Sequence, residues 1–151
     1  MYRSRCGMAF LTLLAVAGCA APSRDLALAD VLPPGDQEWP STPAYTVFFD
    51  LDSALLTPDA IAILDQLIAD PARPRWTRLL LAGHADRSGS ERYNRALSAE
   101  RAEAVRQYLV GAGVADDLIL NAAFGERRGL VGTPDGTVEP QNRRVEIYVR
   151  N

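Results

Sequence analysis

The sequence has few of the residues that most often carry catalysis or bind metals. It contains one histidine, His84, and two cysteines among its 151 residues. A single histidine leaves no histidine pair to bind zinc, and the sequence shows no clear set of nucleophile and base around it. No glycine-rich phosphate-binding motif is present. Asp50 and Asp52 are spaced like metal-binding carboxylates, but two acids at a strand end are more typical of a turn. We therefore expect no enzymatic activity, no cofactor and no metal site.

Long apolar runs are also lacking, since a membrane-spanning helix needs about 20 such residues. The run at 8–17 is shorter; it follows Arg3 and Arg5 and leads into Gly18 and Cys19. This order of basic, apolar and small residues is typical of a secretion signal, so we predict that residues 1–18 are removed. The remaining chain keeps one cysteine, which excludes an internal disulfide.

The end of the signal, residues 14–19, resembles the bacterial lipobox. The resemblance implies that Cys19 is acylated and becomes the new N-terminus; the alternative is an ordinary signal peptide with a chance cysteine. Ala20 follows instead of aspartate, which under the sorting rule of enteric bacteria implies the outer membrane. The cleaved chain has 14 basic and 19 acidic residues, a net charge of −5. An acidic protein is a poor nucleic-acid binder, so we expect no such partner.

The cleaved chain divides into a tether and one domain. Residues 19–44 hold five prolines and few bulky apolar side chains, which is typical of an extended linker. Residues 45–151 show regular patterns, and the order β-α-β-α-β-β predicts a single α+β domain with two main helices packed on a small mixed sheet. The strands are expected at 45–49, 78–83, 118–124 and 143–149, and the helices from Thr57 and over about 98–110.

Arg101 lies beside the apolar stripe of the second predicted helix, in what we take to be its first turn. A cation there is disfavoured by the helix dipole, so an anion held by Arg101 and the free N–H groups of the helix would compensate it. Asp86, in the loop after the second strand, is expected to approach Arg101. Together the two side chains suit a zwitterionic ligand. The alternative is a plain Asp86–Arg101 salt bridge, which spacing alone favours.

Several motifs then follow one another in a distinctive order. They are a strand ending Phe48-Phe49-Asp50, a Gly83-His84-x-Asp86-x-x-Gly89 loop, a helix with Asn94-x-x-Leu97-Ser98-x-x-Arg101-Ala102, and a closing Asn142-Arg143-Arg144-Val145-Glu146. This pattern resembles the OmpA-like peptidoglycan-binding domain, which OmpA, Pal and MotB share, over about 47–149. The resemblance implies non-covalent binding of the diaminopimelate residue of the peptidoglycan stem peptide, by an aspartate and an arginine that match Asp86 and Arg101.

The remaining site residues are assigned more loosely. Ala85 stands where the family usually has threonine, so a hydroxyl contact is missing. Asn94 either fixes the loop or contacts the ligand. Arg143 shares strand parity with buried residues and is expected near the pocket, whereas Arg144 is expected to point away. Asp50 either caps a turn or touches the ligand.

Two functions follow from the resemblance. The first is a tether between the outer membrane, through lipid at Cys19, and the cell wall. The alternative is an envelope lipoprotein that chiefly recruits periplasmic proteins, with exposed apolar residues of the linker or of the 129–138 loop as the contact surface.

Overall fold

The computed structural model describes residues 40–151, so the predicted signal, the lipidation of Cys19 and most of the linker lie outside the described residues. Within this part, neither α-helix is long and apolar enough to cross a membrane. The strands and α-helices are, in chain order, β1 Tyr45–Phe48, α2 Pro58–Ile68, β2 Arg78–His84, α3 Glu91–Gly111, β3 Ile119–Gly125 and β4 Arg144–Arg150. Short 3-10 helices lie at η1 Arg73–Arg75, η2 Asp116–Leu118 and η3 Pro140–Asn142.

The four strands form one mixed sheet in the order β1-β4-β2-β3. β2 and β3 are parallel and are joined through α3, as a parallel pair requires. β4 runs antiparallel to both β1 and β2 and lies between them. This arrangement confirms the predicted α+β fold with two main helices on a small mixed sheet.

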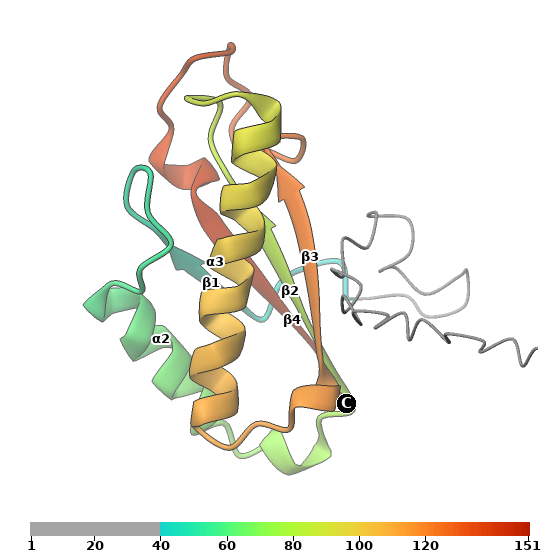
Figure 1. Ribbon diagram of the computed structural model, residues 1–151. Helices are drawn as coiled ribbons and strands as arrows, with labels where there is room; N and C mark the ends of the chain where they lie inside the picture. Colours follow the sequence, from blue (N-terminus) through green and yellow to red (C-terminus); the bar gives the residue numbers. More distant parts are fainter. Residues whose placement is uncertain (1–39) are drawn as a thin grey trace, which may run out of the picture.

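Both helices pack on the same face of the sheet (Figure 1). The main core lies between the two helices and the sheet. Its side chains come from every second residue of the strands and from the apolar stripes of the helices. The central strand β2 is buried on both faces, since Leu79 and Leu81 join the main core, while Leu80 and Ala82 belong to a smaller cluster with Phe124. Burying such apolar area is the main stabilising contribution to the domain.

The predicted start of α2 is confirmed. Thr57 is the N-cap, its hydroxyl accepts a hydrogen bond from the Ala60 N–H at 3.1 Å, and Pro58 occupies the first helical position. Leu64 and Leu67, on the apolar face of this helix, are fully buried. The side-chain cap and the apolar stripe, both readable from sequence, therefore fix this helix.

The predicted start of α3 near residue 98 is wrong. The helix begins at Glu91, and Ser90 is its N-cap, with a hydroxyl that accepts from the Tyr93 N–H at 3.3 Å. Residues 91–96 are mostly polar and, apart from Asn94, exposed to solvent, so apolar periodicity did not reveal them. Arg101 consequently lies in the third turn, and the argument that placed it among the free N–H groups of the helix start does not hold.

The strand directions bring four chain segments to one end of the domain, which we call the loop end. β1, β2 and β3 all end there, and β4 begins there. The β1–α2, β2–α3 and β3–β4 loops are therefore neighbours, and Figure 1 shows the start of α3 at the same end. Asp86, Arg101 and Arg143, which the sequence proposed as site residues, all lie at or near this end.

Candidate functional site

Asp86 is held at the centre of the loop end by four donors. Its Oδ1 accepts from the Ser88 hydroxyl at 2.6 Å and from the Ser88 N–H at 3.3 Å. Its Oδ2 accepts from the Glu139 N–H at 3.2 Å and from Arg143 Nη1 at 3.3 Å. Burial opposes ionisation of this carboxyl, but these hydrogen bonds together hold the pKa of Asp86 below its usual value. Asp86 is therefore an anion at neutral pH although its side chain is only 4% exposed.

Arg101 is completely buried and is bound by backbone carbonyls. Its Nε, Nη1 and Nη2 donate to the carbonyls of Ser53, His84 and Asp50 at 2.8, 3.0 and 3.0 Å. Its guanidinium also lies 5.4 Å from the centre of the Phe49 ring. Burial lowers the pKa of Arg101 to about 10, so the group remains charged at neutral pH.

The predicted direct approach of Asp86 to Arg101 is not present among the described residues. Asp86 forms its ion pair with Arg143 instead, and Arg101 binds carbonyls from the β1–α2 loop and the end of β2. Asp86 nevertheless favours the charged form of Arg101 through space. The alternative, a plain Asp86–Arg101 salt bridge, is also absent from residues 40–151, and the two groups interact through space.

Arg143 is the most accessible of the three charged groups, with a side chain 11% exposed. Its Nε donates to the Phe49 carbonyl at 3.1 Å, while Nη1 binds Asp86. Within residues 40–151 its Nη2 has no hydrogen-bond partner. The predicted strand parity is confirmed, because Arg144 lies on the opposite face of the sheet, where it is buried next to Glu146.

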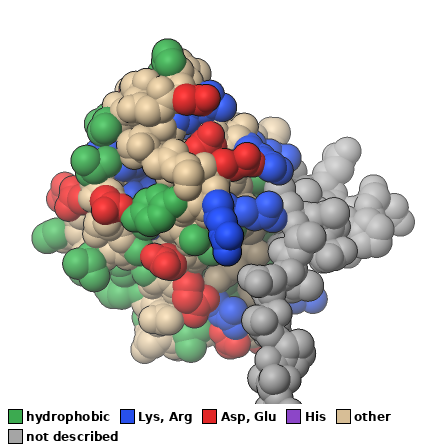
Figure 2. Space-filling model, turned by 45° about the horizontal axis from the view of Figure 1, so that its top comes forward, with side chains coloured by type: hydrophobic (Ala, Val, Ile, Leu, Met, Phe, Trp, Pro, Cys, Tyr) green, Lys and Arg blue, Asp and Glu red, His purple; other side chains and the backbone are tan. Residues whose placement is uncertain are grey.

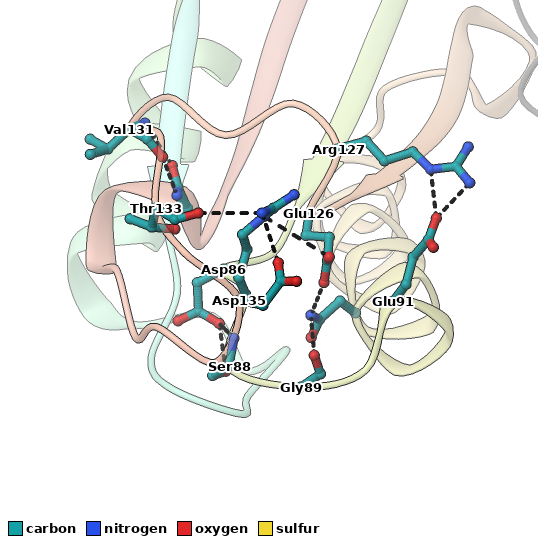
Figure 3. Close-up of polar contacts among 12 residues, drawn as sticks. Asp86, Ser88, Gly89, Glu91, Glu126, Arg127, Val131, Thr133 and Asp135 are labelled. Atoms are coloured by element: carbon teal, nitrogen blue, oxygen red, sulfur yellow. Dashed lines mark hydrogen bonds and ion pairs between the residues drawn. The ribbon is translucent and has the colours of Figure 1, made fainter.

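Asn94 holds the loop end together from α3. It is 1% exposed, and its amide donates to the Gly89 carbonyl at 3.1 Å and to Glu126 Oε2 at 2.6 Å. Of its two proposed roles, the structure shows the one in the loop. Arg87 of the β2–α3 loop binds Asp135 of the β3–β4 loop at 2.7 Å, and Figure 3 shows Asp135 near Gly89 and Glu126. The β2–α3 and β3–β4 loops are therefore fixed to each other around Asp86.

Asp50 contributes its backbone to the site. Its carbonyl binds Arg101, whereas its exposed carboxylate makes no hydrogen bond or ion pair within the part of the chain that the structure describes. The neighbouring Asp52 has a positive φ of 53°, and its carboxylate accepts from the Tyr93 hydroxyl. The Asp50–Asp52 pair therefore belongs to a tight turn, and no cluster of metal-binding side chains is present in residues 40–151.

A second polar cluster lies on the sheet face that the helices leave uncovered. His84, the last residue of β2, is 2% exposed and stacks on Phe124 with ring centres 5.3 Å apart. Burial lowers its pKa, so the ring is neutral at neutral pH. Its Nε2 lies 3.4 Å from Glu146 Oε2, which also accepts from the Tyr148 hydroxyl at 2.7 Å. The buried, stacked ring of His84 therefore has a packing role at the end of β2.

This cluster makes stability depend on pH. Contacts with His84, Tyr148 and Arg144 hold the pKa of Glu146 at about 2, below its ordinary 4.5. A carboxyl with a lowered pKa stabilises the fold above pH 4.5, and this contribution is lost as the pH falls toward 2. We expect urea unfolding to show a loss of about 3 kcal/mol over that range, which Glu146→Gln removes. An equal acid loss in Glu146→Gln and in the original chain would contradict this assignment.

Comparisons with known proteins agree on one family. The model of the OmpA family matches residues 48–143. The chain is 33% identical to the peptidoglycan-associated lipoprotein of Mesorhizobium japonicum over 146 residues, 91% of this chain and 87% of that protein. It is 34% identical to the protein of the same name from Brucella melitensis, over 95% of this chain and 90% of the other. The crystal structure of the peptidoglycan-associated lipoprotein from Burkholderia pseudomallei is similar with a TM-score of 0.61 and 30% identity, covering 70% of this chain and 89% of that one.

Proposed function

Because this chain belongs to the OmpA family, we propose that it is a non-catalytic lipoprotein that binds peptidoglycan and tethers the outer membrane to the cell wall. The relatives cited above carry the name of a peptidoglycan-associated lipoprotein, and none carries that of an enzyme. The ligand group is the zwitterionic end of diaminopimelate in the stem peptide. One observation carries the proposal: a buried carboxylate, Asp86, lies in one site with two guanidinium groups, Arg143 and Arg101.

The chemistry of this site suits an ammonium and a carboxylate held a few ångströms apart. The ligand ammonium binds Asp86, whose four acceptor positions are occupied by internal donors. Three of these contacts are 3.2–3.3 Å long, at or beyond the upper end of the usual N–H···O range, so a charged ligand donor at a shorter distance competes with them. The ligand carboxylate binds the unpartnered Nη2 of Arg143, and Arg101 keeps one further N–H on each terminal nitrogen for the same group.

The direct test is co-sedimentation of the whole protein, in detergent, with purified sacculi that contain diaminopimelate. Asp86→Asn keeps the shape of the side chain but removes its charge, and we expect it to weaken binding at least about tenfold. Free diaminopimelate is expected to compete with the sacculi for the original protein. Asp135→Asn is the matched control, because it removes a carboxylate that is paired with Arg87 in the neighbouring loop and is 87% exposed. The proposal fails if Asp86→Asn pellets as the original protein does.

The membrane side of the tether rests on the sequence. We propose that Cys19 carries the acyl chains, since two or three of them bind a bilayer firmly, and that residues 20–44 span the distance to the wall. The domain then faces the periplasm. Incorporation of labelled palmitate into the original protein, and its absence in Cys19→Ser, is the expected result.

A further inference from the structure

Most large apolar side chains exposed in the described part of the chain gather at the loop end. Of seven such residues, only Val110 lies elsewhere; the other six are Phe48, Leu51, Leu55, Tyr93, Leu130 and Val138. Figure 2 shows the domain with this end turned forward, with apolar patches between acidic and basic side chains. Exposed apolar side chains beside a group of buried charges are typical of a site that contacts more of its ligand than the charged group.

Tyr93 is the one aromatic side chain among these exposed residues that connects two of the site's loops. Its hydroxyl donates to the Asp52 carboxylate in the β1–α2 loop. Its ring packs on Gly89 in the β2–α3 loop, so closely that a Cβ added there would lie 2.8 Å from Cδ1 of the ring. The two loops it joins carry the carbonyls that bind Arg101 and the serine that binds Asp86. Tyr93 is therefore beside the proposed diaminopimelate site.

The ring of Tyr93 is fixed in place and yet accessible. It is anchored by α3, by its hydroxyl and by Gly89, while the residue is 47% exposed. A side chain that is already ordered loses little entropy when a ligand packs on it. Asp52 adds a polar element, since one oxygen of its exposed carboxylate binds Tyr93 and the other has no partner within residues 40–151.

We infer that Tyr93 and Asp52 form a saccharide subsite beside the proposed diaminopimelate site, on which the amino sugar that carries the stem peptide packs. The C–H groups of a pyranose ring suit an aromatic face, and its hydroxyl groups are donors for a carboxylate. The sugar is covalently joined to the peptide, and a short extended peptide spans only about 3.3 Å per residue. A bound stem peptide therefore keeps its sugar close to the exposed side chains of the loop end. This inference rests on the proposed function and adds a second part of the same ligand.

The test compares three ligands by calorimetric titration of the whole protein in detergent: free diaminopimelate, the stem peptide without sugar, and a disaccharide-peptide fragment of peptidoglycan. We expect the disaccharide-peptide to bind about fivefold more tightly than the bare peptide, the effect of one aromatic contact. Tyr93→Ala is expected to abolish that difference, so that the disaccharide-peptide and the bare peptide bind with equal affinity. Tyr108→Ala is the matched control, because Tyr108 also bonds an aspartate, Asp65, at 2.7 Å, but from the far part of α3.

Each outcome separates the two proposals. Equal affinity of the original protein for both peptides overturns the saccharide subsite, and so does an equal loss for all three ligands in Tyr93→Ala, which would assign Tyr93 to loop positioning alone. If only the disaccharide-peptide binds, and binding depends on Tyr93, the subsite stands and diaminopimelate recognition fails. If none of the three ligands binds, both proposals are wrong.

Discussion

Arg101→Ala is expected to lower the free energy of unfolding by about 3–5 kcal/mol, a large share of the 5–15 kcal/mol that a domain typically has. The substitution leaves three carbonyls, those of Asp50, Ser53 and His84, without their donor. It also opens a cavity at a position that is fully buried. Urea unfolding followed by circular dichroism measures the loss.

Arg106→Ala is the matched control for this prediction. Arg106 lies on the same helix, and its side chain is 25% exposed in a pair with Asp116. Exposed pairs contribute little, so we expect a change of less than about 1 kcal/mol. If both variants unfold at the same urea concentration, the carbonyl contacts of Arg101 do not stabilise the domain. The comparison also shows why loss of wall binding in Arg101→Ala does not by itself identify a ligand contact.

Gly83→Ala is expected to cost about 3 kcal/mol and to lower the Tm by about 15 °C. A Cβ at Gly83 would lie 2.0 Å from the carbonyl oxygen of Ser98, so β2 and α3 must separate. Ser98 uses this close approach to accept a hydrogen bond from the Gly125 N–H at 3.0 Å. Separation of the helix from the sheet therefore also breaks a buried contact with β3.

Gly132→Ala provides the comparison, because a Cβ there meets no atom within 4 Å. We expect it to change stability by less than about 1 kcal/mol. Thermal unfolding by calorimetry distinguishes the two variants. A Tm for Gly83→Ala within about 2 °C of that for Gly132→Ala would show that α3 moves away from β2 at little cost.

The fold was largely predictable because its signals are local. The predicted bounds of β2 and β4 agree with the structure to within one residue at each end, alternation having marked β4, and a threonine followed by proline marked the start of α2. The start of α3 was missed for a physical reason. Its first two turns carry Tyr93 and Asn94, which bind loop groups, so no apolar stripe appears there; only Ser90 was a readable cap.

The sequence predicted that the residues of the candidate site lie together, but it did not predict their contacts. Asp86, Arg101 and Arg143 do lie together, yet the partners of Arg101 include two backbone carbonyls about fifty positions away in the sequence. Backbone carbonyls are present at every residue, so no sequence pattern marks those that will accept from a buried arginine. The ion pair between Asp86 and Arg143 likewise depends on where β4 enters the sheet, which only the strand register decides.

The position of β4 also determines when the domain can form. This strand follows the other three in the sequence, yet it separates β1 from β2 and, among the strands of residues 40–151, is the only one that pairs with β1. A partly synthesised chain can assemble β2, α3 and β3, whose contacts are close in sequence, but it cannot complete the sheet or place Arg143 beside Asp86. The candidate site therefore forms only once β4 is available to pair, late in the synthesis of the domain.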